Sequence, residues 1–149
     1  MKILSQRSPA WSDVKLGQSN LKVGRFGCTT VAISMLSDYF GSYFDPTILA
    51  TVTLKYTADG LLLWPSVNNI SNMRFVERVR GRNDAKIIES LKDPNKACIL
   101  EVQGRHWVTA IKRNFFGSSY TVVDPWFGDK CDVLKRYKAI SGSAHFAAK

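Results

Sequence analysis

Cys28 stands directly after a glycine and directly before a segment with the hydrophobic periodicity of an amphipathic helix. Apolar side chains on one face of that helix recur at Ala32, Met35, Leu36, Tyr39 and Phe40, and Gly41 follows as a helix stop. At a helix N-terminus, unpaired backbone N–H groups and the positive end of the helix dipole stabilise a thiolate. The pattern makes Cys28 the candidate nucleophile, although a cysteine before a helix is often only a small buried side chain.

The other two cysteines are expected to be unreactive. Cys98 lies within the apolar run ACILEV, which predicts a packed side chain, and Cys131 follows a Gly-Asp-Lys turn without a base placed for it. An odd number of cysteines with no Cys-x-x-Cys pair argues against a disulfide framework. The cysteines and the two histidines also lack the close spacing of zinc ligands, so the sequence predicts no metal and no cofactor.

A predicted hairpin brings a histidine and an aspartate together. Residues 106–112 and 119–124 alternate as strands do, across a turn centred near Phe115. Numbers of paired residues then add up to about 230, which sets His106 opposite Asp124, although a bulge would shift this register by one. The register also pairs Val108 with Val122 and Ala110 with Tyr120. Opposed side chains have Cβ atoms about 5 Å apart, so the Asp124 carboxylate should accept a hydrogen bond from the His106 imidazole.

These residues have the types of a nucleophile, a base and a group that orients the base. Cys28 would attack, His106 would hold its proton, and Asp124 would fix the imidazole ring. His145 is a rival base, but it lies in the last predicted strand near Ser143 and has no obvious carboxylate partner. Each feature alone is more often structural than catalytic, and it is their order along the chain that favours catalysis.

Helices are predicted first along the chain and strands mostly afterwards. The helices start at Cys28, at an Asp45 cap before Pro46 running towards Lys55, near Asp59 or Gly60 to include Leu62, Leu63 and Trp64, and at an Asn83 cap. The strands are expected at residues 73–79, 97–102, 106–112, 119–124, 131–137 and 141–148. This order predicts the α+β class, and 149 residues fit one domain over residues 1–149.

The chain carries a formal net charge of +9, which attracts polyanions such as nucleic acid, teichoic acid or an acidic membrane face. A strand would place four basic side chains on one face as a stripe, because they share even parity: Arg74, Arg78, Arg80 and Arg82. A solvated outer face is the more common meaning of such a stripe. No apolar run is long enough for a signal peptide or a membrane span, which predicts a soluble protein.

Four segments in this order resemble the papain-like cysteine peptidases: SQRSPAW near the N-terminus, GxxGC before a helix, GRHWVTAI and YTVVDPWFG. Within that superfamily the chain resembles the branch of the bacteriocin leader-processing, or double-glycine, peptidases. The resemblance runs from about Gln6 to Phe146. It implies a papain-like fold, in which a helical N-terminal half with a central helix after Cys28 faces a C-terminal antiparallel sheet across a cleft.

The resemblance also implies a role for each matching residue. Cys28, His106 and Asp124 would form the catalytic triad, and the Gln6 side chain would form the oxyanion hole with the backbone N–H of Cys28. Such an enzyme hydrolyses peptide or amide bonds without a cofactor. Without the resemblance, Gln6 would be interpreted as a surface polar residue in a mobile N-terminal segment.

Two departures from that branch bear on the substrate. Leader-processing peptidases typically carry Asp-Cys-Gly at the nucleophile, whereas this chain reads Gly27-Cys28-Thr29, and no transporter segments follow. The chain is therefore more similar to standalone relatives of bacteria and phages, for which cleavage of peptides, including those of peptidoglycan, is expected. The expected location is the cytoplasm or a phage particle.

Two other classes of function stay open. A papain-fold module without activity would bind a polyanion or a protein partner, and salt-sensitive binding with tolerance of Cys28→Ser would favour it. An acyl or peptidyl transferase would share the acyl-enzyme chemistry, and only its products would separate it from a hydrolase. The sequence does not give the oligomeric state.

Overall fold

The computed structural model describes residues 1–114 and 118–149 of the chain. Within this part, six strands form one antiparallel sheet in the order β1-β6-β2-β3-β4-β5. The strands are β1 (Met73–Arg80), β2 (Lys96–Val102), β3 (His106–Arg113), β4 (Tyr120–Asp124), β5 (Asp129–Asp132) and β6 (Gly142–Ala148). The helical segments are α1 (Val23–Phe26), α2 (Cys28–Tyr39), α3 (Pro46–Ile48), the π-helical turn η1 (Leu49–Thr53), the 3₁₀ helix η2 (Trp64–Asn69), α4 (Asp84–Lys92) and α5 (Val133–Tyr137).

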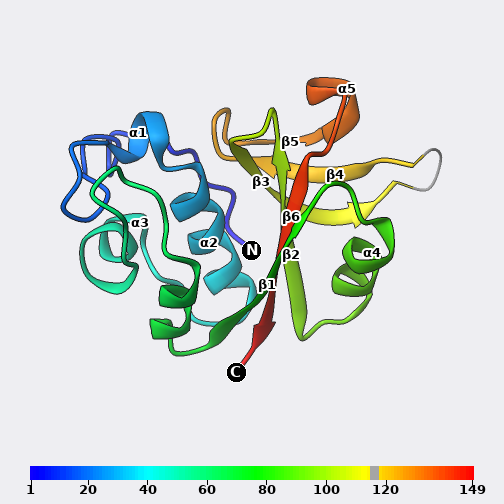
Figure 1. The fold of residues 1–149 in the computed structure, drawn as a ribbon, viewed down its shortest axis with the longest axis horizontal. Helices are drawn as coiled ribbons and strands as arrows, with labels where there is room; N and C mark the ends of the chain where they lie inside the picture. Colours follow the sequence, from blue (N-terminus) through cyan, green and yellow to red (C-terminus); the bar gives the residue numbers. More distant parts are fainter. Residues whose placement is uncertain (115–117) are drawn as a thin grey trace.

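The helices of the N-terminal half gather on one side of the molecule, and the sheet with α4 and α5 forms the other (Figure 1). This is the α+β arrangement that the sequence predicts. None of the helices described in residues 1–114 and 118–149 is long and apolar enough to cross a membrane.

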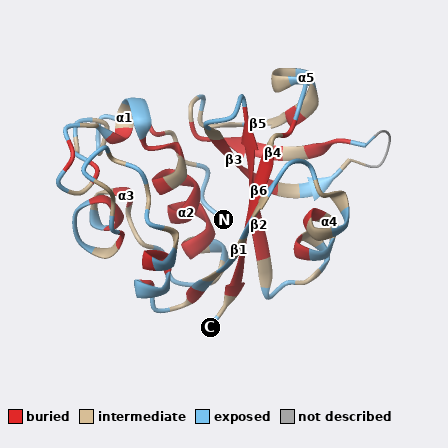
Figure 2. Ribbon diagram, viewed as in Figure 1, coloured by how far each residue is buried: buried red, intermediate tan, exposed pale blue. Residues whose placement is uncertain are grey.

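Helix α2 is the central helix, and it starts at Cys28 as predicted. One apolar cluster joins Leu36 of α2 to Trp107 of β3, and a second joins Met35 of α2 to Val123 of β4. Residues of α2 are accordingly buried along almost its whole length (Figure 2). Because apolar packing fixes the helix on two sides, the position of its first residue relative to β3 and β4 is fixed as well.

The opposite face of the sheet is covered by α4, a helix that the sequence also predicts. The Asn83 side chain caps this helix by accepting a hydrogen bond from the Lys86 backbone N–H at 3.1 Å. Ile87 packs there against Cys98 and Val108 of the central strands. The centre of the sheet is therefore buried on both faces.

Two predicted elements are wrong. The third helix does not begin near Asp59 or Gly60, because Leu62 is extended in a bridge with Tyr56 and the helical turn starts only at Trp64. Pro65 lies in the first turn of η2, where a missing N–H is tolerated, so it marks the start of this helix.

The second wrong element is the strand expected for residues 131–137. Only its first two residues belong to β5, and the rest forms α5. The Asp132 carboxylate caps α5 by accepting hydrogen bonds from the backbone N–H groups of Leu134 and Lys135, each at 3.1 Å. This cap is the local cause of the change from strand to helix.

A bulge in β1 divides the predicted basic stripe. The register of β1 shifts between Phe75 and Glu77, which moves one residue out of the alternation. Arg78 consequently stacks over the Trp107 ring on the α2 side, with its guanidinium carbon 5.3 Å from the ring centroid. Arg74 instead lines a shallow pocket on the α4 side, together with side chains of α4. The prediction that these arginines share one face is therefore wrong.

Candidate active site

The hairpin of β3 and β4 exists, but its register differs from the predicted one. The observed pairs are Thr109 with Val123, Ala110 with Val122, Lys112 with Thr121 and Arg113 with Tyr120. The predicted pairs Val108–Val122 and Ala110–Tyr120 are thus wrong by two residues. A bulge directly after Ala110 adds a residue to β3, which a symmetric count across the turn cannot include. The predicted turn centre, Phe115, lies outside the described residues.

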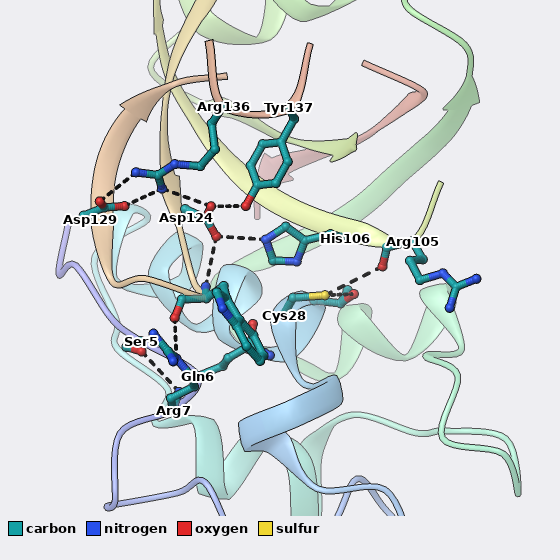
Figure 3. Close-up of polar contacts among 12 residues, drawn as sticks. Ser5, Gln6, Arg7, Cys28, Arg105, His106, Asp124, Asp129, Arg136 and Tyr137 are labelled. Atoms are coloured by element: carbon teal, nitrogen blue, oxygen red, sulfur yellow. Dashed lines mark hydrogen bonds and ion pairs between the residues drawn. The ribbon is translucent and has the colours of Figure 1, made fainter. Parts of the chain in front are cut away.

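The side chains of His106 and Asp124 meet despite this shift. Up to the bulge after Ala110 the slip is two residues, which keeps the side chains there on their predicted face, because side chains alternate with a period of two. The two residues now lie diagonally across the hairpin, and His106 Nε2 is 2.8 Å from Asp124 Oδ1 (Figure 3). The predicted hydrogen bond between the imidazole and the carboxylate is confirmed.

Cys28 points from the head of α2 towards this pair (Figure 3). Its Sγ lies 4.0 Å from the backbone carbonyl oxygen of Arg105 and 3.9 Å from Oγ1 of Thr29. Because Asp124 takes Nε2 of His106, Nδ1 is the ring nitrogen left for the thiol. The structure therefore brings the predicted nucleophile, base and orienting carboxylate to one place.

Gly27 explains how the nucleophile comes to stand there. A Cβ at this position would lie 2.6 Å from both Cα and the carbonyl oxygen of Val23, which is closer than atoms can pack. The Gly27 N–H donates to the same Val23 carbonyl at 2.8 Å, closing α1 directly before α2 begins. A residue with a side chain would separate the two helices, so the glycine fixes Cys28 at the first position of α2.

The protonation of His106 follows from its neighbours. Burial of the ring opposes its charged form, but the hydrogen bond to Asp124 and the contact with Cys28 outweigh burial and raise the pKa of His106 to about 9. An imidazole with such a pKa keeps its proton at neutral pH. A protonated imidazole beside the thiol is in position to supply a proton, as a general acid does.

Comparison with known proteins identifies the fold. The sequence matches no protein-family model and no curated protein. Among solved structures, the chain is similar to the N-terminal peptidase C39-like domain of the toxin secretion ATP-binding protein from Vibrio parahaemolyticus. The TM-score is 0.61 over 82% of this chain and 97% of that domain, with 16% sequence identity. This chain has the peptidase C39-like fold. The predicted papain-like architecture is confirmed by this likeness, which at such an identity concerns the fold alone.

In this C39-like fold, two neighbouring side chains of α5 bind the second oxygen of Asp124. The Tyr137 hydroxyl donates to Asp124 Oδ2, and Arg136 Nη1 donates to the same oxygen at 3.1 Å. Arg136 is held in turn by Asp129, whose two oxygens lie 2.7 and 2.9 Å from its terminal nitrogens. The Tyr137 ring also lies beside the His106 ring, with centroids 5.6 Å apart. Both side chains therefore fix the carboxylate on which His106 depends.

Sequence reasoning missed these residues because it assigned them to a strand. The available signal was Asp132 directly before VLKRY, an N-cap residue followed by good helix formers. Even if α5 had been predicted, the sequence would not have shown that the end of this helix contacts Asp124, because that contact is tertiary.

Asp124 remains ionised although no part of it reaches solvent. Burial opposes its charge, but hydrogen bonds from His106, Tyr137 and the Trp126 backbone N–H outweigh that effect and lower the pKa of Asp124 to about 2. The Trp126 N–H lies 3.0 Å from Oδ1, on the same oxygen as the imidazole. Asp124 is thus a fixed anion over the whole neutral range, as an orienting group must be.

Gln6 is buried rather than mobile, with 1% of its surface exposed. Its backbone N–H donates to the Pro125 carbonyl at 2.8 Å, and its Nε2 donates to the Gly24 carbonyl at 3.4 Å. Its Oε1 makes no hydrogen bond to any described residue. The side chain therefore lies between the loop after Asp124 and the helix that leads to Cys28.

The rival base His145 belongs to a different part of the molecule. Its Nδ1 is 2.8 Å from Ser90 Oγ of α4, and its Nε2 is 2.8 Å from Ser143 Oγ. Both ring nitrogens are thus occupied on the α4 side of the sheet, away from Cys28. Burial lowers the pKa of His145, so its ring is neutral at pH 7.

The two other cysteines lie in surroundings that oppose a thiolate. Burial raises the pKa of the Cys98 thiol to about 12 and that of the Cys131 thiol to about 11. Across residues 1–114 and 118–149, no three His, Cys, Asp or Glu side chains are grouped as a metal site needs.

Proposed function

We propose that the protein is a cysteine peptidase or amidase that acts through Cys28, His106 and Asp124. The single observation that carries this proposal is the position of His106, between a thiol at the head of a buried helix and a fully buried carboxylate. The C39-like fold supports it, because it places such a helix against such a strand. A protein that only binds a partner would not need a thiol beside an imidazole that is itself hydrogen-bonded to a buried carboxylate.

The reaction follows from the positions of these groups. The Cys28 thiolate attacks the carbonyl carbon of the scissile bond, and the His106 imidazolium gives its proton to the amine, which leaves. A water molecule then attacks the thioester, transferring its proton through the imidazole, and releases the acid and the thiol. Asp124 keeps the ring in place throughout, held by α5 and by the Trp126 N–H.

Gln6 is proposed as an oxyanion donor together with the backbone N–H of Cys28. Only one hydrogen of its Nε2 is engaged, by the Gly24 carbonyl, so the second is available for the developing oxyanion. Its backbone link to Pro125 supports this role, because it fixes Gln6 relative to the loop of Asp124. Replacing Gln6 with alanine should lower kcat by about a hundredfold or more.

The substrate is proposed to be a peptide of bacterial origin, with peptidoglycan stem peptides as the first class to test. Leader-processing peptidases carry an aspartate where this chain has Gly27, and the Val23 backbone leaves no room for that side chain. Recognition that depends on this aspartate is therefore not expected in this protein. The residue before the nucleophile thus distinguishes this chain from peptidases that process double-glycine leaders.

The test compares wild type with Cys28→Ala, using Cys131→Ala as the matched control. Each protein is incubated with peptidoglycan stem peptides, double-glycine leader peptides and a mixed peptide library, and products are identified by mass spectrometry. Wild type and Cys131→Ala should cleave at the same bonds, and Cys28→Ala should lose at least about a thousandfold in rate. Products formed in ¹⁸O-labelled water separate hydrolysis from transfer. Equal cleavage by Cys28→Ala would refute the proposal.

A further inference from the structure

Arg7 lies directly after Gln6 and beside the loop that follows Asp124 (Figure 3). Its Nε–H donates to the backbone carbonyl of Trp126 at 2.8 Å, and its guanidinium carbon lies 4.8 Å from the centroid of the Trp126 ring system. The Phe127 ring flanks the same group at 5.9 Å. Arg7 is an exposed residue, yet one hydrogen bond and two aromatic rings fix its orientation.

The terminal nitrogens of Arg7 are free. Within residues 1–114 and 118–149 they make no hydrogen bond, and no carboxylate forms an ion pair with this side chain. Other arginines of the chain do bind carboxylates, among them Arg78, Arg82 and Arg136. Stacking occupies the flat faces of a guanidinium and leaves its N–H edge open. Arg7 therefore presents a preorganised pair of donors that suits a carboxylate.

Two links place this donor pair relative to the reaction. The Gln6 backbone N–H binds the Pro125 carbonyl, and the Trp126 N–H binds the Asp124 carboxylate. Arg7 is thus attached to the loop that begins at Asp124, the residue that orients His106. The leaving amine receives its proton from His106, so the leaving part of a substrate is expected beside His106 and this loop.

From these positions we infer that Arg7 binds a carboxylate in the leaving part of the substrate, an inference that rests on the proposed peptidase function. Two sources share this chemistry: an Asp or Glu side chain shortly after the scissile bond, and the free C-terminal carboxylate of a short leaving peptide.

The charge around the site agrees with an acidic substrate. The segments next to Cys28 comprise residues 5–7, 24–29, 103–106 and 124–128, and their one acidic residue is the buried Asp124. Arg25 and Arg105 are exposed in the same segments. The exposed charges of these segments are positive, and the neighbouring Asp129 carboxylate is paired with Arg136, so the rim raises the local concentration of anionic peptides.

The first experiment uses a peptide that wild type cleaves and changes one group at a time. Glu is compared with Gln at each of the first three positions after the scissile bond, and a free C-terminus is compared with an amidated one. The carboxylate form should be preferred about five- to tenfold in kcat/KM at low salt. Arg7→Gln should bring that ratio to about one, and Arg7→Glu should prefer Lys at the same position. Arg80→Gln is the control and should keep the wild-type ratio, because Arg80 is an exposed arginine of β1 that forms no ion pair with a described residue.

A second measurement does not depend on turnover. The Nε–H resonance of Arg7 is followed by NMR in Cys28→Ala during titration with acetyl-Gly-Gly-Glu-amide, with acetyl-Gly-Gly-Gln-amide as the neutral control. The resonance should shift with the Glu peptide only. An unchanged resonance, or a Glu to Gln ratio that is the same in wild type and Arg7→Gln, would overturn the inference. Absence of hydrolysis together with a shifted resonance would instead count against the peptidase function and leave the carboxylate site standing.

Discussion

The molecule contains two places where a cysteine and a histidine are neighbours, and they have opposite properties. Cys28 and His106 meet at the head of α2. Cys98 and His145 are paired directly across β2 and β6, on the face that α4 covers. The residue types are the same, so the difference must come from what surrounds them.

The surroundings differ first in the partner of the histidine. His106 contacts an ionised carboxylate, and its pKa is raised to about 9, whereas His145 contacts two neutral hydroxyls and burial lowers its pKa. A neutral hydroxyl can satisfy a buried imidazole but does not stabilise its positive charge. The comparison shows that a fixed anion, and not mere proximity of sulfur and imidazole, separates a candidate site from a structural contact.

The surroundings differ also at the thiol. Cys28 is the first residue of a helix, where free N–H groups and the helix dipole favour negative charge. Cys98 lies inside a central strand, where the backbone N–H groups are used by the neighbouring strands and the side chain is fully buried. Burial therefore raises the pKa of the Cys98 thiol.

The largest expected effect is on thiol alkylation. At pH 7, iodoacetamide should modify Cys28 at least about a hundredfold faster than Cys98. The Cys98 thiol, with a pKa of about 12, is ionised in roughly one molecule in 100,000 at that pH. Mass spectrometry of the digested protein measures both rates, and Cys131 is a third, partly exposed reference. Equal rates for the three cysteines would remove the distinction between the two places.

Replacing the histidines should separate activity from stability. His106→Ala should lower hydrolysis by about a thousandfold while the protein stays folded, because the base and acid of the reaction are lost. His145→Ala should keep the activity per folded molecule but destabilise the protein by about 1–3 kcal/mol, since two buried hydroxyls lose their partner. Urea unfolding and initial rates measure the two effects. Loss of activity in folded His145→Ala would contradict the assignment of His145 to a structural role.

The candidate site was predictable because its central features are local in the sequence. The helix at Cys28 follows from periodicity, and the meeting of His106 with Asp124 follows from strand alternation, which tolerates a register error of two residues. The β3 bulge that causes this error has no glycine or proline to announce it. A pattern with period two therefore fixes the face of a side chain more securely than its exact partner.

The parts that failed depend on tertiary contacts or on single residues that override a pattern. The bulge after Phe75 turns Arg74 and Arg78 to opposite faces of the sheet. The prediction rested on their even residue numbers, which carry no sign of a bulge. Helix α5 spans only five residues, too few for periodicity, and its cap at Asp132 was the one local sign. The contact of α5 with Asp124 at the end of β4 is tertiary, so the sequence alone could not predict it.

Changes in α5 should have a moderate effect on catalysis. They test whether α5 is what lets Asp124 orient His106, in contrast to the serines that contact His145. Arg136→Gln and Tyr137→Phe should each lower kcat by about tenfold with little change in KM, because Asp124 and His106 lose their fixed orientation. In an Asp124→Ala background neither change should have a further effect, since both act through that carboxylate.

Arg82→Gln is the matched control for Arg136. Each of these arginines pairs with an aspartate and lies over an aromatic ring, which is Tyr120 for Arg82 and Phe127 for Arg136. Arg82→Gln should leave kcat unchanged. If Arg136→Gln lowered the rate equally in the presence and absence of the Asp124 carboxylate, α5 would support the fold in general and not the orientation of His106.

The smallest expected effect is a difference in the pH dependence of stability, with opposite signs for the two histidines. The pKa of His106 is raised on folding, so its contribution to stability is complete below the unfolded value of about 6.5 and is lost as the pH rises through about 9. The pKa of His145 is lowered on folding, so its contribution is complete above about 6.5 and is lost as the pH falls through the lowered value. The Tm difference between wild type and His106→Ala should therefore shrink from pH 7 to pH 10, and that between wild type and His145→Ala should shrink from pH 7 to pH 5. Scanning calorimetry across this range measures both differences, and the same sign for both would mean that the Asp124 carboxylate does not set His106 apart.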